Sequence, residues 1–228
     1  MNKQAVFFDL GLRDYKVVWD LQHELVEKRA QDEIPDVLIL CEHSHVITLG
    51  RRAVSKFASH LRTCELVYGI PCYAVERGGD MTYHGPGQLV GYSIMRLEPS
   101  HRGLHRYLRD LEEVLILALG DFGIEAQRRS SYTGVWTARP PPQKKIASIG
   151  IAVRRWVTYH GFALNINTNL NFFKQISPCG LDGAIMTSME QLLQCPIEME
   201  VVKDSVKRHF EEVFDVSLTP ELISSWWR

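Results

Sequence analysis

The segment KIASIGIAVRRWVTYHGFALNINTNL, residues 145–170, constrains the fold more than any other stretch of the chain. It is the longest strand-like region, and the prolines of ARPPPQKK forbid regular structure just before it. Hydrophobic periodicity predicts further strands at 5–11, 37–41, 46–49, 71–80, 88–97 and 133–138, and helices at 13–31, 103–123 and 199–214, with a weaker helical pattern over 53–67. Strands and helices do not alternate regularly. The sequence therefore predicts one α+β domain over residues 1–228, with a mixed, mainly antiparallel sheet covered by helices.

Composition excludes several classes of protein. The net charge is -1, which gives no overall electrostatic case for a nucleic-acid or membrane partner. No apolar run approaches the ~20 residues of a membrane span, and the N-terminal residues resemble neither a signal nor a transit peptide. We therefore expect a bacterial cytoplasmic protein, with a mitochondrial location as the alternative.

Cysteine and histidine spacing argues against disulfides and metals. The five cysteines are odd in number and irregularly spaced, and no C-x-x-C pair occurs. His43 and His45 have no third ligand at a metal-binding spacing. We expect no disulfide framework, no metal site and no bound cofactor.

The stretch RGGDMTYHGPGQL, residues 77–89, has the composition of an irregular loop between two strands. Its glycines allow close approach of the backbone to a ligand, and it also carries polar side chains, among them Arg77 and His84. Two interpretations remain open, a ligand cradle and a solvated turn. The loop matches neither the dinucleotide-binding nor the P-loop glycine pattern.

One lysine and one cysteine are candidate catalytic residues. Cys179 stands between proline and glycine in ISPCGL, which specifies its backbone tightly, although a buried structural cysteine is the alternative. A thiolate nucleophile needs a nearby cation that lowers the thiol pKa. Lys145, at the start of the strand in KKIASIG, is the candidate cation, while Lys144 is better explained as solvated.

Taken together, RGGDMTYHGPGQLVGY, KKIASIGIAVRRWVTYHGFALN and ISPCGL resemble the signature segments of the lipoyl(octanoyl) transferase family. EHSHVITLGRR, before the first of these segments, and SYTGVW, between the first and the second, occur in the expected order, and the resemblance runs from about residue 5 to about residue 195. It implies a two-layer α+β fold similar to the biotin and lipoate protein ligases, with a larger mixed sheet, a smaller sheet and outer helices. Residues 1–228 would then form a single octanoyltransferase catalytic domain.

The resemblance also implies the site. Cys179 would be the nucleophile and Lys145 its partner. The substrate-binding positions would be Arg77, Gly78, Gly79, Asp80, Met81, Thr82, Tyr83, His84, Ser148, Ile149, Gly150, Gly161, Phe162 and Ala163.

The implied reaction moves an octanoyl group from octanoyl-acyl carrier protein, through a Cys179 thioester, to a lysine ε-amine. The acceptors would be lipoyl domains of 2-oxoacid dehydrogenase complexes and the glycine cleavage H protein. Such partners are usually acidic, so we expect a basic docking face from Arg51, Arg52, Lys144, Arg154 and Arg155.

Three rival functions remain: an ATP-dependent lipoate or biotin ligase, a thioester hydrolase, and a non-catalytic module that binds acyl carrier or lipoyl domains. A ligase needs a lysine but no cysteine nucleophile, so ISPCGL favours the transferase.

Overall fold

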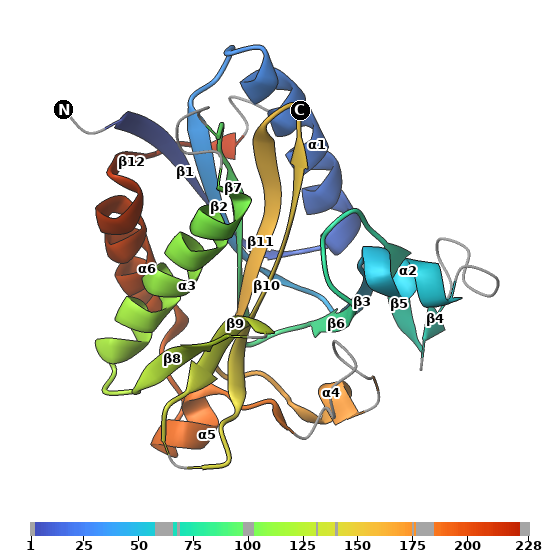
Figure 1. The fold of residues 1–228 in the computed structure, drawn as a ribbon, viewed down its shortest axis with the longest axis vertical. Coiled ribbons are helices and arrows are strands. Elements are labelled where there is room, and N and C mark those ends of the chain that lie inside the picture. Colours follow the sequence, from blue (N-terminus) through green and yellow to red (C-terminus); the bar gives the residue numbers. More distant parts are fainter. Residues whose placement is uncertain are drawn as a thin grey trace.

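The computed structural model describes residues 3–57, 66–67, 69–97, 103–130, 132–139, 141–174, 176 and 185–223. Its helices and strands are shown in Figure 1. The strands are β1 (Lys3–Arg13), β2 (Asp36–His43), β3 (Val46–Leu49), β4 (Leu66–Val67), β5 (Ile70–Ala74), β6 (Met81–His84), β7 (Gln88–Ile94), β8 (Ala126–Arg129), β9 (Tyr132–Thr137), β10 (Lys145–Arg154), β11 (Val157–Asn165) and β12 (Val216–Pro220). The helices are α1 (Tyr15–Ala30), α2 (Arg51–Phe57), α3 (Leu104–Gly120), α4 (Asn171–Lys174), α5 (Met189–Leu193) and α6 (Met199–Phe214).

Two sheets organise the molecule. The larger has eight strands in the order β12-β1-β2-β7-β11-β10-β9-β8, and the smaller has four in the order β4-β5-β3-β6. Strand β1 pairs in parallel with β2 and β12, and the other pairs of the large sheet are antiparallel. The predicted fold class, α+β with a larger mixed sheet and a smaller one, is confirmed.

Helices cover both faces of the large sheet, because its strands are apolar on both sides. In β1, Ala5 and Phe7 pack into a core with α3 and α6, whereas Val6 and Phe8 pack into a second core with α1. The period-2 alternation of a strand sends neighbouring residues to opposite faces. Figure 1 shows α3 and α6 side by side on one face and α1 on the other.

Most predicted helix positions agree with the structure. Helix α1 begins after Asp14, whose Oδ1 accepts hydrogen bonds from the backbone N–H groups of Lys16 at 2.8 Å and Val17 at 3.3 Å. The weak helical pattern over 53–67 was wrong at its end, since α2 covers 51–57 and residues 66–67 pair with β5 as strand β4. A seven-residue helix and a two-residue strand are too short for periodicity to separate.

The edge of β10 positions the functional region. Strand β10 pairs with β11 from Ala147 to Arg154, but its register with β9 includes only Lys145 and Ala147. Beyond that point the backbone N–H of Gly78 donates to the carbonyl of Ile151 at 2.9 Å. This glycine-rich loop, residues 77–80, is therefore held against the open edge of the large sheet. The irregular loop expected over 77–89 was wrong in part, because residues 81–84 form strand β6, which pairs with β3.

Candidate active site

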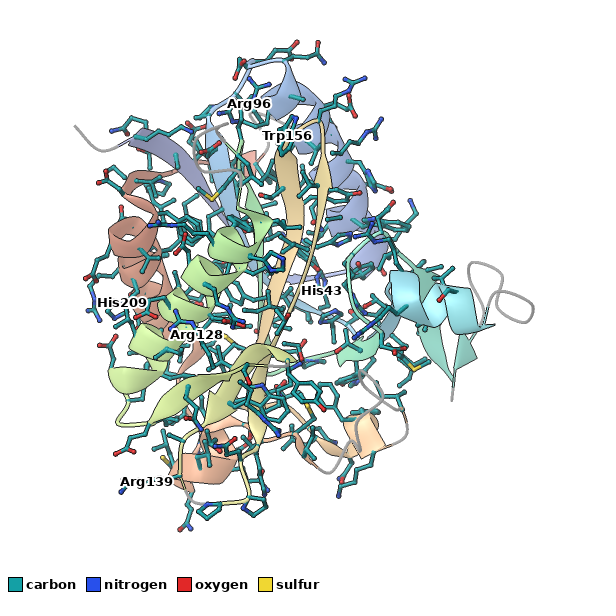
Figure 2. The ribbon with its side chains drawn as sticks, in the orientation of Figure 1. His43, Arg96, Arg128, Arg139, Trp156 and His209 are labelled. Atoms are coloured by element: carbon teal, nitrogen blue, oxygen red, sulfur yellow. The ribbon has the colours of Figure 1, made fainter. Side chains whose placement is uncertain are left out.

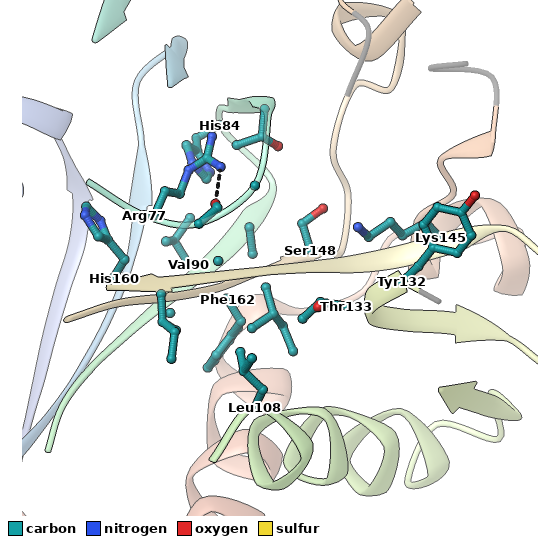
Figure 3. Close-up of a pocket in the computed structure, with 18 of the residues that line it drawn as sticks. Arg77, His84, Val90, Leu108, Tyr132, Thr133, Lys145, Ser148, His160 and Phe162 are labelled. Atoms are coloured by element: carbon teal, nitrogen blue, oxygen red, sulfur yellow. Dashed lines mark hydrogen bonds between the residues drawn. The ribbon is translucent and has the colours of Figure 1, made fainter. Parts of the chain in front are cut away.

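A cavity of about 420 Å³ lies between the β10–β11 hairpin, the glycine-rich loop and the start of α3. Figure 3 shows Lys145 and Tyr132 at one end of the cavity and Arg77, His84 and His160 toward the other. Its walls combine apolar and polar groups, with Val90, Ile149, Phe162, Leu104 and Leu108 among the apolar ones. Such a cavity suits a ligand with a hydrocarbon part and a polar part.

Lys145 is the first residue of β10 and is only 4% exposed. Its ammonium nitrogen lies 5.7 Å from the centroid of the Trp136 ring, within the range of a cation–π contact. The backbone of Lys145 forms a bridge with Met186, and its carbonyl accepts a hydrogen bond from the N–H of Thr187 at 2.9 Å. A buried lysine with a fixed backbone thus lies directly beside Met186 and Thr187.

Gly134 makes room for that lysine. A Cβ atom at Gly134 would lie 2.7 Å from Cε of Lys145 and 2.5 Å from the carbonyl oxygen of Ala147. The φ of Gly134 is +117°, which side chains rarely adopt, and its N–H donates to Oε1 of the fully buried Glu112 at 2.9 Å. Gly134 is not among the predicted site residues, although a glycine inside a strand is itself a sign of close packing.

Arg77 fastens the glycine-rich loop to the small sheet. Its Nη2 donates to the carbonyl of Thr48 at 2.7 Å and to Oγ1 at 2.8 Å, and its Nε donates to the same Oγ1 at 3.2 Å. Gly50 permits this approach, because a Cβ there would lie 2.6 Å from the carbonyl of Gly79. Arg77 both lines the cavity and holds the shape of its wall.

The facing positions of β10 and β11 form the floor. Ser148 pairs with Ala163 and Gly150 with Gly161, and all four line the cavity. A Cβ at Gly161 would lie 2.1 Å from the carbonyl of Gly91, so Gly161 is required for close strand packing. Gly91 in turn leaves room for the ring of Phe162, because a Cβ at position 91 would lie 2.2 Å from Cζ of that ring.

The structure brings together most residues that the resemblance assigned to substrate. The cavity is lined by Arg77, Gly78, Gly79, Thr82, His84, Ser148, Ile149, Gly150, Gly161, Phe162 and Ala163. Three assigned residues do not line it. Asp80 is buried and its Oδ1 accepts from the N–H of Met81, Met81 packs against the core of the small sheet, and the hydroxyl of Tyr83 bonds His45 at 2.7 Å.

Cys179 lies outside the described residues, so its predicted role stays a prediction. Arg51 and Arg52, which were expected on a docking face, also line the cavity. The lining further includes residues that sequence reasoning missed: Tyr15, Val90, Tyr92, Leu104, Leu108, Tyr132, Thr133, Ile151, Ile185 and Met186. Tyr15 and Tyr92 lie in apolar faces of α1 and β7, where an aromatic residue reads as core and gives no signal of a site.

His160 and His84 both line the cavity. Burial lowers the pKa of His160, whose Nε2 lies 3.3 Å from Oε2 of Glu76, and burial lowers that of His84 to about 3. Burial alone would raise the pKa of Glu76, but hydrogen bonds from His160 and its own backbone lower it to about 2. His160 has φ +59°, an uncommon conformation for a residue other than glycine.

The five basic residues expected to form one docking face do not lie together. Strand β10 has ten residues and spans roughly 30 Å, with Lys144 before its start and Arg154 at its end. Figure 2 labels Trp156, beside Arg155, and Arg139, in the loop before Lys144, at opposite ends of the molecule. Arg154 and Arg155 pair with Glu27 at 3.0 and 2.8 Å.

No group of three or more potential metal ligands occurs among the described residues. In the same part of the chain, no helix is long and apolar enough to cross a membrane.

The chain matches the model of the lipoyl protein ligase A/B catalytic domain over residues 14–211. An octanoyltransferase of Cytophaga hutchinsonii is 42% identical and covers 95% of each chain. An octanoyltransferase of Syntrophotalea carbinolica is 46% identical over 90% of this chain and 92% of its own. This chain belongs to the octanoyltransferase family. It is an acyltransferase, and the resemblance inferred from its motifs is confirmed.

Solved structures support the fold of this octanoyltransferase family member. A lipoate-protein ligase A bound with ATP has a TM-score of 0.70 and 14% identity, over 97% of this chain and 89% of its own. A bipartite lipoate protein ligase from Thermoplasma acidophilum has a TM-score of 0.67 and 14% identity, over 97% and 87% of the two chains. A biotin protein ligase from Aquifex aeolicus is more distant, with a TM-score of 0.50 over 94% and 70%. The likeness to both ligase types is the one that the motifs implied.

Proposed function

We propose that this acyltransferase moves an octanoyl group from octanoyl-acyl carrier protein to a lysine ε-amine of a lipoyl domain, through a thioester on Cys179. The observation that carries the proposal is Lys145, a buried lysine at one end of a partly apolar cavity. Met186, the bridge partner of Lys145, is seven residues after Cys179 in the sequence. A lysine so placed supplies the positive charge that a thiolate nucleophile needs.

The first half-reaction forms an acyl-enzyme. The Cys179 thiolate attacks the carbonyl carbon of the donor thioester, and a new C–S bond forms. When the tetrahedral intermediate collapses, the phosphopantetheine thiolate leaves and takes a proton from the Lys145 ammonium, which leaves Lys145 neutral. The ammonium of Lys145 favours the thiolate form of Cys179 and so raises the concentration of the nucleophile.

The second half-reaction forms the amide. The ε-amine of the acceptor lysine attacks the acyl-enzyme carbonyl, a C–N bond forms, and the Cys179 thiolate leaves. The amine loses one proton in this step, and neutral Lys145 is the group proposed to accept it. Because a thioester is converted into a more stable amide, the two half-reactions together need no nucleotide to drive them.

The cavity also fits the acyl chain. Val90, Ile149, Phe162, Leu104 and Leu108 line it, and its volume is about 420 Å³. Burying about seven methylenes at ~0.8 kcal/mol each would contribute several kcal/mol to binding. The small residues of the floor, Ser148, Gly150, Gly161 and Ala163, keep that space open.

An ATP-free transfer assay tests the proposal. Purified protein is mixed with octanoyl-acyl carrier protein and a lipoyl domain, and the octanoylated domain is measured by mass. We expect product with wild type, none with Cys179→Ala, and a strong reduction with Lys145→Met. Product formation by Cys179→Ala at the wild-type rate would contradict the cysteine mechanism.

One observation favours a second candidate, an ATP-dependent ligase, because the fold resembles a lipoate-protein ligase A bound with ATP. That likeness, at 14% identity, shows the fold alone. The same assay separates the two functions. Modification that requires ATP and free octanoate, and that fails with octanoyl-acyl carrier protein, would identify a ligase.

A further inference from the structure

Two buried amides connect His84 to the segment at Thr187, which lies beside Lys145. Gln88 and Asn165 are each 1% exposed and face one another on β7 and β11. Nε2 of Gln88 donates to Oδ1 of Asn165 at 2.9 Å, and Nδ2 of Asn165 donates to the carbonyl of Thr187 at 3.0 Å. The N–H of Thr187 in turn donates to the carbonyl of Lys145. The other end of the network is Nδ1 of His84, 2.8 Å from Oε1 of Gln88.

The donors and acceptors in this network are determined by two backbone carbonyls. A carbonyl oxygen can only accept, so the carbonyl of Thr187 must face the NH₂ group of Asn165, which turns Oδ1 toward Gln88. Oδ1 then requires a donor, the NH₂ group of Gln88. The carbonyl of Tyr83, 3.3 Å from the same NH₂ group, independently requires this orientation. Oε1 of Gln88 is therefore the atom that faces His84.

The orientation of Gln88 fixes the tautomer of His84. Because Oε1 accepts, Nδ1 of His84 must carry the hydrogen that it donates. Burial keeps the imidazole neutral, and the neighbouring His43, Arg77 and His160 also disfavour a second proton. In a neutral imidazole with a protonated Nδ1, Nε2 carries a lone pair and can only accept a hydrogen bond.

The ring of His84 is held in place within the cavity wall. It stacks on Tyr15 with ring centroids 6.0 Å apart and planes 8° from parallel, and His43 lies edge-on at 6.1 Å. His84 lines the cavity and is 7% exposed. Among the described residues, Nε2 of His84 makes no hydrogen bond within the protein, and it is not one of the fully enclosed side-chain atoms without a partner, so an acceptor in the cavity wall is left for a ligand to satisfy.

We propose that Gln88 and Asn165 are positioning residues that hold His84 as a hydrogen-bond acceptor for an N–H group of the bound substrate. The identity of that substrate rests on the proposed function, whereas the tautomer does not. The octanoyl chain has no donor, and its carbonyl would be repelled by Nε2. The donor is then either an amide N–H of the phosphopantetheine arm or the ε-amine of the acceptor lysine. His84 therefore favours a substrate group that carries an N–H over a group, such as a carbonyl, that can only accept a hydrogen bond.

The tautomer is tested by ¹⁵N-histidine NMR of the full chain, with the His84 signals assigned by their loss in His84→Phe. We expect a protonated Nδ1 and a bare Nε2, unchanged between pH 8 and pH 5. Gln88→Leu removes the acceptor that fixes the His84 tautomer, so the Nε2–H tautomer should appear in this variant. Asn167→Ala is the matched control, since within the described part of the chain the side chain of Asn167 bonds only Ile197, at 2.8 and 2.9 Å, and the variant should leave the His84 signals as in wild type. An Nε2–H tautomer or a charged ring in wild type would overturn the proposal.

Rapid-mixing kinetics identify the donor. His84→Phe keeps a ring that can stack on Tyr15 but has no acceptor, and His84→Gln offers an amide oxygen instead. We expect His84→Phe to slow one half-reaction about 10- to 100-fold and His84→Gln to recover part of that rate. Slowed acylation by octanoyl-acyl carrier protein would indicate the pantetheine amide, and slowed transfer to the lipoyl domain would indicate the lysine amine.

Two kinetic outcomes would refute the role of His84. One is wild-type rates of both half-reactions in His84→Phe. The other is an equal loss in both variants that matches an equal fall in their unfolding midpoints, which would make His84 a packing residue. If wild type forms no acyl-enzyme at all, the proposed function fails, and the NMR result still decides the tautomer.

Discussion

Gly134→Ala should have two effects: it should displace the side chain of Lys145, and it should destabilise the protein. The added Cβ would lie 2.5 Å from the carbonyl of Ala147 and 2.7 Å from Cε of Lys145, distances that real Cβ contacts do not show. The backbone carbonyl cannot withdraw easily, so the lysine or the strand must move. The φ of +117° adds strain for any residue with a side chain.

The magnitude follows from these two effects. Overpacking in a closed structure costs about 1–3 kcal/mol, and an unfavourable backbone conformation costs about 1–3 kcal/mol. We expect a loss of about 2–5 kcal/mol in the free energy of unfolding, which lowers Tm by about 5–15 °C in a chain of this size. Because the collision involves the side chain of Lys145, we also expect acyl-enzyme formation to slow at a temperature where the variant is fully folded.

Denaturant unfolding and single-turnover acylation measure the two effects. Gly120→Ala is the matched control, since a Cβ there meets nothing within 4 Å and its site is helical. It should match or slightly exceed wild type in stability. A Gly134→Ala protein as stable as wild type would refute the steric argument. A destabilised variant with the wild-type rate of acylation would show that acyl-enzyme formation does not depend on the position of Lys145.

Three further predictions concern charge, packing and pH. Lys145→Met should raise the pKa of the Cys179 thiol, so that the pH profile of its alkylation by iodoacetamide moves upward by about one unit or more; an unmoved profile would remove Lys145 as the cation. Gly91→Ala should push the Phe162 ring, whose Cζ would be 2.2 Å from the new Cβ, and cost about 1–3 kcal/mol of stability while raising KM for octanoyl-acyl carrier protein; unchanged KM would separate that ring from substrate binding. His84 has its pKa lowered by burial from 6.5 to about 3, so the unfolded chain binds one more proton between these values and stability must fall as pH decreases from 6.5 toward 3. His84→Phe should remove about 1.4 kcal/mol per pH unit of that slope, measured by denaturant unfolding at pH 7 and pH 5, and an identical slope in the variant would contradict a neutral His84.

The sequence could predict the parts of this fold that rest on one-dimensional patterns. The apolar period of 199–214 and of 103–123 is a property of the segment alone, and α6 and α3 occupy those residues closely. The strand character of 145–170 was equally readable, but its division into β10 and β11 by a turn at Arg155 and Trp156, both with positive φ, was not predicted. What the pattern could not show is that β10 has an open edge after Ala147, because that depends on where β9 stops pairing.

Part of the candidate site could be predicted, because the resemblance of a motif assigns all of its residues to the site as one block. It assigned the whole run 77–84, yet Tyr83 points to His45 and Phe172 in the small sheet while its neighbour His84 faces the cavity. Alternation along β6 separates them, and a motif carries no such direction. Gly134 and Asn165 were missed for a different reason. Their importance lies in a contact with Lys145 and in a hydrogen bond to Gln88, 77 residues away in the chain.

The measurement that tests the central claim most directly is intact-protein mass spectrometry after mixing with octanoyl-acyl carrier protein in the absence of ATP. We predict one added octanoyl group on wild type, located on the peptide that contains Cys179, removed by hydroxylamine and lost when a lipoyl domain is added. Cys179→Ala should show no adduct. An adduct that persists in Cys179→Ala, or a wild type that is modified only with ATP and free octanoate, would contradict the account.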